Sequence, residues 1–272
     1  MPSRLRAVYC DLDGTLVGRG GSLLHDGEGR ISTAGARAAE ACLRAGVELV
    51  LTSGRRRETV QQPARLIGQP SFVYESGAVV VLDGEEHWLT GDYTPRDGRT
   101  THELVEATGA PALLLEHFAG QLEYHDPWHV GRTVSHLFRG HVDALEADAL
   151  LAEHGHAELR LVDNGGAEGA PRMVGIESPR AYQLVPRAVS KATGVAFHQR
   201  ARGYAAHECV AVGDSREDLG MAEVVERFWL VANALERDPS LRQALTPNVR
   251  VAEGRHGEGV YEAVLTELAE RR

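Results

Sequence analysis

The stretch AVYCDLDGTL at residues 7–16 decides the fold, because a short apolar run passes directly into a polar turn that contains glycine. An apolar run of this length, ended by turn residues, is typical of a buried parallel strand. Strand-like and helix-like segments then alternate, with helices expected over residues 32–45 and 56–67 and strands over 47–51 and 71–74. This alternation predicts an α/β fold, a doubly wound parallel sheet with helices on both faces.

The same alternation returns after residue 186. The elements expected there are helices over 188–201, 219–225 and 258–271 and strands over 208–212, 228–231 and 248–251. Both ends of the chain therefore contribute to one sheet, and residues 1–84 and 187–272 are predicted to form a single core domain.

The segment between these two parts has a different composition, since nine of the 13 histidines lie between His87 and His156. Regular alternation is weak there. The elements expected are a hairpin of 79–82 and 85–89 around Asp83-Gly84, helices over 97–108 and 143–154, strands over 159–162, 173–177 and 182–185, and a flexible loop over 163–171. Residues 85–186 are therefore predicted to form a smaller, inserted α+β domain.

Composition excludes several classes of protein. With 43% hydrophobic and 25% charged residues, the 272-residue chain has the balance of a soluble globular protein with more than one domain. Its formal charge of −10 makes nucleic acid and anionic membrane poor candidates for the main partner. No apolar run approaches the ~18 residues of a membrane span, and Cys10, Cys42 and Cys209 show no CxxC spacing. We therefore expect a cytoplasmic protein with reduced thiols.

Two carboxylates follow the first expected strand, in Asp11-Leu12-Asp13-Gly14-Thr15. Because one residue separates Asp11 from Asp13 at a strand end, both can approach one ligand from the same turn. The first carboxylate can attack phosphorus, and the second can protonate the leaving oxygen and later activate water. The alternative is a structural pair of turn or helix-capping aspartates.

Two further motifs follow later strands of the predicted sheet. The sequence SGR at residues 53–55 offers a hydroxyl and unhindered backbone amides at a helix start, which suits an anion, although the same residues can be an ordinary helix cap. The sequence GDSRED at residues 213–218 adds Asp214 and Asp218, whose hard oxygen atoms suit Mg²⁺. An ordinary loop with a helix cap is the alternative for the GDSRED sequence.

Lys191 is the only lysine among 29 basic residues, and it lies near the start of an expected helix. A compact ammonium can meet a phosphate as a point donor in a way that a planar guanidinium cannot. Chance retention of an exposed lysine is the alternative. Counted along the chain, the first motif is residues 11–15, the second is residues 53–55, the third is Lys191 and the fourth is residues 213–218. Together they place phosphate-compatible groups where a parallel sheet offers its ligand crevice.

In this order, the four motifs resemble those of the haloacid dehalogenase (HAD) superfamily phosphatases. The resemblance is strongest to the Cof-type (IIB) subgroup, which has a large cap between the second and third motifs and includes sugar-phosphate, sucrose-phosphate and mannosyl-3-phosphoglycerate phosphatases. It covers about residues 5–84 and 186–262, and the cap only by position and size. It implies a Mg²⁺-dependent phosphatase of a small phosphorylated metabolite, a sugar phosphate or a phosphoglycerate glycoside, with the cap selecting the substrate.

The resemblance also implies a role for each motif residue. Asp11 would be the nucleophile and a Mg²⁺ ligand, and Asp13 would be the acid/base and give its carbonyl to Mg²⁺. Asp214 would be the third metal ligand. The groups that would bind the phosphoryl group are the Leu12 backbone amide, Ser53, Gly54 and Lys191. The residues that would support the site are Ser215, Glu217 and Asp218.

Two positions depart from the family pattern. Glu217 stands where the GDxxND motif has Asn, and its carboxylate would repel phosphate unless it turns away or meets the metal or Arg216. Ser76 replaces the Asn of the family's ENGA segment, which residues 74–78 resemble. Two further segments of the family are matched by VANA at residues 231–234 and GEGV at residues 257–260.

The insert contributes candidate ligands of lower specificity. Six polar residues are candidates to contact the substrate or, alternatively, to be solvated surface side chains: Arg132, His136, Arg139, Arg172, Arg180 and Tyr182. His125 and His129 have an i,i+4 spacing that would suit zinc on a helix, but Pro127 between them argues against a regular helix.

Three other functions are compatible with parts of this pattern. A phosphomutase would use the same aspartyl phosphate and return the phosphoryl group to the substrate. A catalytically weak HAD-fold binding or regulatory protein would keep the fold, and the departures at Glu217 and Ser76 favour it. A plain α/β ligand-binding module does not account for four phosphate-compatible motifs in order.

Overall fold

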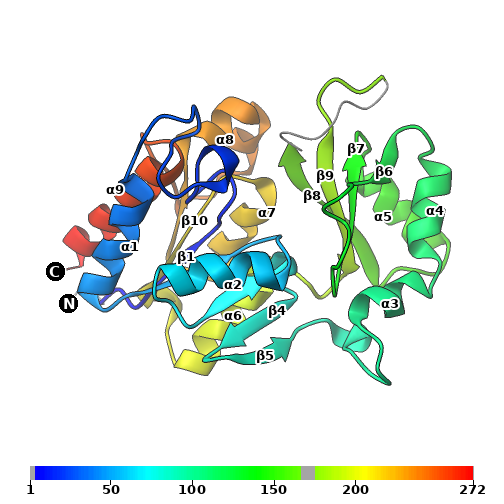
Figure 1. Cartoon of the computed structure of the whole chain (residues 1–272), viewed down its shortest axis with the longest axis horizontal. Coiled ribbons are helices and arrows are strands. Elements are labelled where there is room, and N and C mark those ends of the chain that lie inside the picture. Colours follow the sequence, from blue (N-terminus) through cyan, green and yellow to red (C-terminus); the bar gives the residue numbers. More distant parts are fainter. Residues whose placement is uncertain (1–3, 167–174, 272) are drawn as a thin grey trace. The chain divides into compact units, whose positions relative to one another are not determined.

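The structure is a computed structural model that describes residues 4–166 and 175–271. The chain divides into two compact units, one formed by Met1–His87 with Lys191–Arg272 and the other by Trp88–Ser190. The larger unit is therefore assembled from both ends of the chain, with the smaller unit inserted between them (Figure 1). These boundaries lie within a few residues of the predicted insert 85–186.

The larger unit contains eight strands and the helices that connect them. In chain order these are β1 (Ala7–Cys10), α1 (Ala34–Ala45), β2 (Glu48–Thr52), α2 (Arg57–Leu66), β3 (Phe72–Tyr74), β4 (Val79–Leu82), β5 (Glu85–Trp88), α6 (Lys191–Arg202), β10 (Cys209–Gly213), α7 (Arg216–Leu219), β11 (Arg227–Leu230), α8 (Ala232–Arg237), β12 (Val249–Val251) and α9 (His256–Glu270).

The strand order of this sheet is β12-β11-β10-β1-β2-β3-β4-β5. The strands from β12 to β3 are parallel, and β4 pairs with β3 in the antiparallel direction. The chain passes outward from β1 through β2 to β3 and, later, outward from β10 through β11 to β12 on the other side. The order reverses between β1 and β10, and the carboxyl ends of the strands at such a reversal are where open α/β sheets bind ligands.

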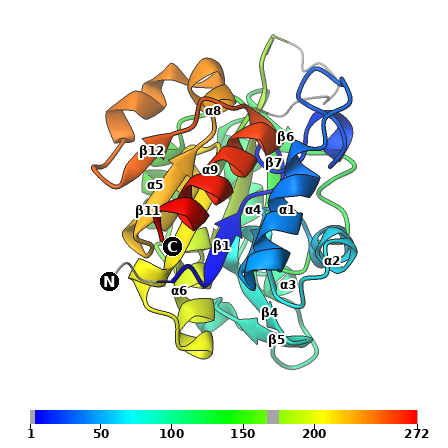
Figure 2. The same ribbon diagram turned by 90° about the vertical axis from the view of Figure 1, so that its left-hand side faces the viewer.

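Burial explains why the sheet forms from these sequences. Every residue of β1 and of β10 is buried, as expected for apolar strands covered on both faces. Helices α1 and α9 lie together on one face, and α6 and α7 lie on the other (Figures 1 and 2). Gly46 ends α1 in the left-handed conformation at φ 66°, as the sequence predicts.

The smaller unit contains a four-stranded antiparallel sheet of order β6-β7-β9-β8 with helices packed against it. Its elements are α3 (Thr101–Glu106), α4 (Ala110–His117), β6 (Leu122–Tyr124), β7 (His136–Gly140), α5 (Ala144–Glu153), β8 (Leu159–Gly166) and β9 (Arg180–Pro186). Its apolar core joins the helices to the sheet through residues such as Leu114, Leu151 and Phe138. The predicted fold class, a parallel α/β sheet with a smaller α+β unit, is confirmed.

Two local predictions in this unit are wrong. The loop expected over 163–171 begins later, because β8 continues to Gly166 and pairs Asp163 with Tyr182. An irregularity of register between Asp163 and Gly166 accommodates the glycines, which is how a bulge tolerates them. Of the strand expected over 173–177, residues 175–177 form a turn and an isolated bridge. The remainder of both predictions, residues 167–174, lies outside the described residues.

Helix α4 and strands β6 and β7 have no counterpart among the sequence predictions. Helix α4 has apolar residues on most of its surface, so it lacks the helical period that marks an amphipathic helix. Strand β7 is fully buried although it includes a histidine and an arginine. Within residues 4–166 and 175–271, no helix combines the length and the apolar character required to cross a bilayer.

Candidate active site

The carboxyl ends of β1 and β10 bring two aspartates to the same edge of the sheet. Asp11 follows β1 directly, and its backbone amide donates to the Val212 carbonyl of β10 over 3.0 Å. Asp214 follows β10. The two residues are only 5% and 3% exposed. The first and fourth sequence motifs therefore meet at the point where the strand order reverses.

Lys191, the first residue of α6, lies among the carboxylates of these motifs. Its Nζ is 2.7 Å from Oδ1 of Asp11 and 2.5 Å from Oδ1 of Asp218. Oε2 of Glu217 is 3.4 Å away. The lysine side chain is 5% exposed, so the alternative of a solvated lysine is wrong.

Burial and charge shift the pKa values of this cluster. Burial raises the pKa of the Asp11 carboxyl well above its usual range, although Lys191 opposes the shift. Burial also raises the pKa values of Asp214 and Glu217. For Lys191, burial alone would lower the pKa, but the carboxylates around it, Asp11 first, raise it well above its usual range. The ammonium is therefore charged at neutral pH.

A divalent cation fits these residues. Asp11, Asp214 and Asp218 each offer a carboxylate oxygen, and the three oxygen atoms lie within 4.8 Å of one another. With Glu217 the cluster holds four buried carboxylates, against two cationic side chains that contact them. A cation of charge +2 would balance the remaining formal charge, and hard oxygen atoms are the ligands that Mg²⁺ prefers.

The turn after β1 is shaped around Asp214. Thr15 donates its hydroxyl to Oδ1 of Asp214 at 3.1 Å. Gly14 has φ +80°, and a Cβ on it would lie 2.2 Å from Oδ2 of Asp214. Only glycine therefore allows this close approach, which explains the glycine of the first motif.

Asp13 lies in the same turn but outside the buried cluster. Its side chain is 56% exposed, and its carboxylate accepts two hydrogen bonds from Arg55, from Nε at 2.6 Å and from Nη2 at 2.5 Å. A bidentate pair of this kind fixes the orientation of the carboxylate. The structure thus joins Asp13 to the second motif through Arg55 and not to Asp11.

The second motif forms a compact turn after β2. Ser53 is buried, and its Oγ accepts a hydrogen bond from the Arg55 backbone amide over 3.2 Å. Gly54 lies between these two residues. Leu12 is buried in the turn after β1, where its carbonyl accepts from the amide of Val17 at 3.0 Å. The phosphate-binding roles of these three residues, Leu12, Ser53 and Gly54, stay predictions.

The fourth motif begins α7 with a reciprocal cap. The Ser215 side chain accepts from the Asp218 amide at 3.2 Å, and Oδ2 of Asp218 accepts from the Ser215 amide and hydroxyl. Glu217 turns toward the start of α6, where its Oε1 accepts from the Lys191 backbone amide at 3.2 Å. A carboxylate at a helix N-terminus is favoured by the helix dipole. This contact, and not one to Arg216, accounts for the unusual acidic residue.

Three residues that fix the first and fourth motifs were missed by sequence reasoning as site residues. Arg237 donates from Nη2 to Oδ2 of Asp214 at 2.6 Å. Asn233 donates to the Gly14 carbonyl at 2.8 Å, and Nδ1 of His256 lies 3.0 Å from the same oxygen. The VANA segment marks Asn233, but Arg237 and His256 carry no motif that could have identified them.

A family model described as haloacid dehalogenase-like hydrolase matches residues 8–117 and 170–247, more than half of the chain. The chain belongs to this family. The two matched segments run from β1 through α4 and from before β9 to beyond α8, and so include all four motifs. The predicted superfamily and the predicted enzyme class, a hydrolase, are thereby confirmed.

Several relatives of this HAD hydrolase are named phosphatases. A phosphoglycolate phosphatase of Methanoculleus marisnigri is 27% identical over 96% of this chain and 95% of its own length. One of Archaeoglobus fulgidus is 29% identical, with 95% coverage of each chain. The crystal structure of a Synechocystis sucrose-phosphatase with sucrose and phosphate shares the fold at a TM-score of 0.65, with 15% identity over 97% of this chain and 98% of that one. The two phosphoglycolate phosphatases are thus relatives over nearly the whole chain, and the sucrose-phosphatase shares its fold.

The segment of the HAD hydrolase that resembles ENGA has an unusual backbone. Glu75 and Ser76 are both buried and have φ values of +45° and +57°. Asn adopts this left-handed region more readily than most residues with a side chain, which gives a physical reason for the Asn of the family pattern. The Ser76 amide donates to the Ser53 carbonyl at 3.0 Å, so this segment supports the second motif.

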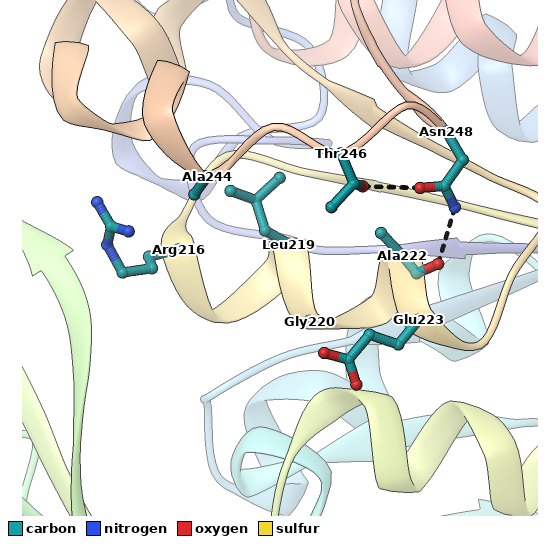
Figure 3. Close-up of a pocket in the computed structure, with 8 residues that line it drawn as sticks. All are labelled: Arg216, Leu219, Gly220, Ala222, Glu223, Ala244, Thr246 and Asn248. Atoms are coloured by element: carbon teal, nitrogen blue, oxygen red, sulfur yellow. Dashed lines mark hydrogen bonds between the residues drawn. The ribbon is translucent and has the colours of Figure 1, made fainter.

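A surface cavity of about 370 Å³ lies elsewhere in the larger unit (Figure 3). Its lining includes Leu219, Glu223 and Ala244, and Asn248 closes one side by donating to the Ala222 carbonyl at 2.8 Å. None of the predicted catalytic or metal-binding residues lines it. The candidate active site is therefore the carboxylate cluster and not this cavity.

In the smaller unit, several of the polar candidates have structural partners. Tyr182 is buried in the core, and its hydroxyl donates to the Val142 carbonyl at 2.9 Å. His136 is 1% exposed, and Arg139 is 8% exposed and paired with Glu123. None of these three is a solvated surface side chain, so that alternative is wrong for them.

Some of the remaining polar candidates of the smaller unit also have partners within that unit. Arg132 donates to the hydroxyl of Ser135 at 3.0 Å, and Arg180 pairs with Asp163 at 2.6 Å. Arg172 lies outside the described residues. Residues 125–129 form turns, as Pro127 indicates, and in the described part of the chain His125 and His129 belong to no group of three possible metal ligands.

Proposed function

We propose that this HAD hydrolase is a Mg²⁺-dependent phosphatase that hydrolyses a small phosphorylated metabolite through an aspartyl-phosphate intermediate. One observation carries the proposal. A buried lysine lies 2.7 Å from the Asp11 carboxylate, at the edge of the sheet where Asp214 and Asp218 offer oxygen atoms for a cation. A nucleophile, a phosphate-binding ammonium and a metal site are thus within reach of one small anion.

The metal would be held by the Asp11 and Asp214 carboxylates and by the Asp13 carbonyl, with Asp218 supporting Lys191. When bound, Mg²⁺ supplies positive charge that offsets the repulsion between the carboxylates and the phosphate. The raised pKa values of Asp11 and Asp214 support this assignment, because burial leaves their charged forms in need of a counter-ion.

The first step forms a bond between an Asp11 oxygen and phosphorus while the bond from phosphorus to the alcohol oxygen breaks. Asp13 gives its proton to that leaving oxygen. Lys191 stabilises the charge on the equatorial phosphoryl oxygens, which is the main requirement of phosphoryl transfer. Because Arg55 holds the Asp13 side chain in this structure, Asp13 reaches the leaving oxygen only when that pair opens.

In the second step a water oxygen attacks phosphorus, its proton passes to Asp13, and the bond between phosphorus and Asp11 breaks. Inorganic phosphate and the free Asp11 carboxylate are the products, and Asp13 is again protonated for the next substrate. The smaller unit is the proposed determinant of which alcohol is accepted, since the roles proposed for the motif residues all concern transfer of the phosphoryl group.

The substrate proposal combines the sequence and its relatives. Two relatives that align over nearly the whole chain are named phosphoglycolate phosphatases, so phosphoglycolate is the first compound to test. Sugar phosphates and mannosyl-3-phosphoglycerate follow from the resemblance to the Cof-type subgroup. All are small phosphate monoesters, which is the chemistry that this cluster can serve.

The test measures phosphate release from this panel and from p-nitrophenyl phosphate, with Mg²⁺ and with EDTA. We expect Mg²⁺-dependent turnover that is lost in Asp11→Asn and retained in Asp126→Asn, a matched substitution at an aspartate that is 77% exposed in the smaller unit. Absence of turnover under all conditions would favour a binding or regulatory protein. A requirement for a bisphosphorylated activator, without net phosphate release, would favour a phosphomutase.

A further inference from the structure

The smaller unit contains a second group of possible metal ligands, formed by His102, Glu106 and His136. Each offers one ligand atom, and the three atoms lie within 4.8 Å of one another. His102 and Glu106 are four residues apart on α3, so both side chains lie on one face of that helix. His136 begins β7. Three ligands from two elements thus meet within one unit.

Backbone hydrogen bonds fix the tautomer of both imidazoles. Nδ1 of His102 lies 3.0 Å from the Ser135 carbonyl, and Nε2 of His136 lies 3.1 Å from the His102 carbonyl. A carbonyl oxygen only accepts hydrogen bonds, so the nitrogen that faces it must carry the proton. The other nitrogens, Nε2 of His102 and Nδ1 of His136, therefore carry lone pairs.

The lone pair on Nδ1 of His136 accepts no hydrogen bond from the described residues. Its side chain is fully buried, and its Nδ1 has no hydrogen-bond partner among the described residues. The nearest charged atom is Oε2 of Glu106 at 3.3 Å, which is also an acceptor when ionised. Two imidazoles with lone pairs and a carboxylate thus lie together, with no hydrogen-bond donor to Nδ1 of His136 among the described residues.

We propose that His102, Glu106 and His136 form a binding site for a divalent transition metal, Zn²⁺ by preference, in the smaller unit. Two imidazole nitrogens and one carboxylate oxygen are a donor set that suits Zn²⁺ and leaves room for water. The backbone carbonyls that orient the two rings are the outer partners that such ligands require. The rings now stack with centroids 3.8 Å apart, so a small rotation must accompany binding.

This site differs from the carboxylate cluster in its chemistry. Nitrogen ligands favour Zn²⁺ over Mg²⁺, whereas the all-oxygen cluster of Asp11 and Asp214 suits Mg²⁺. A bound Zn²⁺ would link α3 to β7 and so stabilise the smaller unit. The proposal does not rest on phosphatase activity, and its test can succeed or fail independently of it.

The experiment is a Zn²⁺ titration of untagged protein by calorimetry in excess Mg²⁺, which keeps the carboxylate cluster occupied. We expect one Zn²⁺ per chain in the wild type. Glu106→Gln should weaken binding beyond the roughly 10- to 100-fold cost of losing an outer partner of a metal ligand. The Glu106 side chain is 57% exposed, so the variant should fold, whereas replacing the buried His136 risks misfolding.

Glu146→Gln is the matched control, because Glu146 lies 3.9 Å from His117 on the exterior of the same unit. It should bind Zn²⁺ like the wild type. Visible absorption of Co²⁺-substituted protein gives a second readout, with bands that Glu106→Gln loses and the control keeps. Equal Zn²⁺ affinity in the wild type and Glu106→Gln, or no binding by the wild type in excess Mg²⁺, would overturn the proposal.

Discussion

The possible metal sites of the two units of this HAD hydrolase are built from different kinds of side chain. The larger unit buries charges, with Lys191 held between the carboxylates of Asp11 and Asp218. The smaller unit buries neutral imidazoles, since burial lowers the pKa values of His125 and His136 to about 4 and about 3. A buried charged group requires a counter-ion, whereas a buried neutral imidazole requires only a hydrogen-bond partner or a metal ion. The chemistry that each unit can perform follows from this difference.

The largest expected effect comes from the charged cluster. Asp11→Asn removes the proposed nucleophile and should lower kcat by at least ~10³-fold, which is about 4 kcal/mol of barrier. The proposed mechanism gives the buried histidines of the smaller unit no role, so His125→Gln should leave kcat within a few-fold of the wild type. Steady-state phosphate release measures both. Near-wild-type turnover by purified Asp11→Asn would contradict the assignment of Asp11 as the nucleophile.

Removal of the buried cation should cost stability in the larger unit. Lys191→Met leaves Asp11, Asp218 and Glu217 without their shared ammonium, and breaking a buried ion pair in this way costs about 3–5 kcal/mol of unfolding free energy. Arg139→Met is the comparison in the smaller unit, where the partner Glu123 is 48% exposed and can be hydrated.

Urea denaturation of the two variants sharpens the contrast. The loss for Lys191→Met should clearly exceed the loss for Arg139→Met, and a second substitution, Asp218→Asn, should restore part of the stability that Lys191→Met removes. Equal losses in the two single variants would show that burial of charge does not distinguish the units.

The positions of Asp11 and Asp214 could be predicted because strand ends of a parallel sheet share one edge, whereas Lys191, at the start of α6, was a candidate as the only lysine. The apolar runs of β1 and β10, each buried throughout, fix that edge in the sequence. The partners of these residues could not be predicted in the same way. Arg237 reaches Asp214 from α8 through tertiary packing alone, and no local pattern records such a contact.

The directions in which side chains point could also not be predicted from the sequence. Asp13 is one residue from Leu12 in the first motif, yet it turns out to Arg55, because a guanidinium in the next loop offers it two hydrogen bonds. The direction of Glu217 could not be predicted either, because its contact with the Lys191 amide joins residues 26 positions apart in the sequence. In β8, glycines predicted a loop, but pairing with β9 overrides local propensity.

The pH dependence of stability compares one buried histidine from each unit. Burial lowers the pKa of His198 in the larger unit and of His125 in the smaller one to about 4. In the unfolded chain both titrate near 6.5, so the unfolded state binds more protons between these values. Stability that is fully present above pH 6.5 is therefore lost as the pH falls toward 4, by about 3 kcal/mol for each histidine.

Urea denaturation at pH 7 and pH 4 checks this effect in the wild type, His198→Gln and His125→Gln. Each variant should lose less stability on acidification than the wild type does. A fall of the same size in a variant would mean that its histidine is protonated in the folded state, against the direction of the pKa shift. The comparison shows whether both units are sensitive to acid or only one of them.

The smallest expected effects come from the helix caps, of which each unit has a similar one. Ser215 starts α7 with a reciprocal bond to Asp218, and Thr100 starts α3 with the same arrangement to Glu103. Loss of either cap, in Ser215→Ala or Thr100→Ala, should cost about 1 kcal/mol of unfolding free energy. The two variants should differ in activity, because the Ser215 hydroxyl also donates to Asp218 at 2.6 Å, and Asp218 holds Lys191. A lower kcat in Ser215→Ala alone would show that the Ser215 cap also positions Asp218 and Lys191 in the active site. An equal kcat in both variants would show that Ser215 acts only as a helix cap, as Thr100 does in α3.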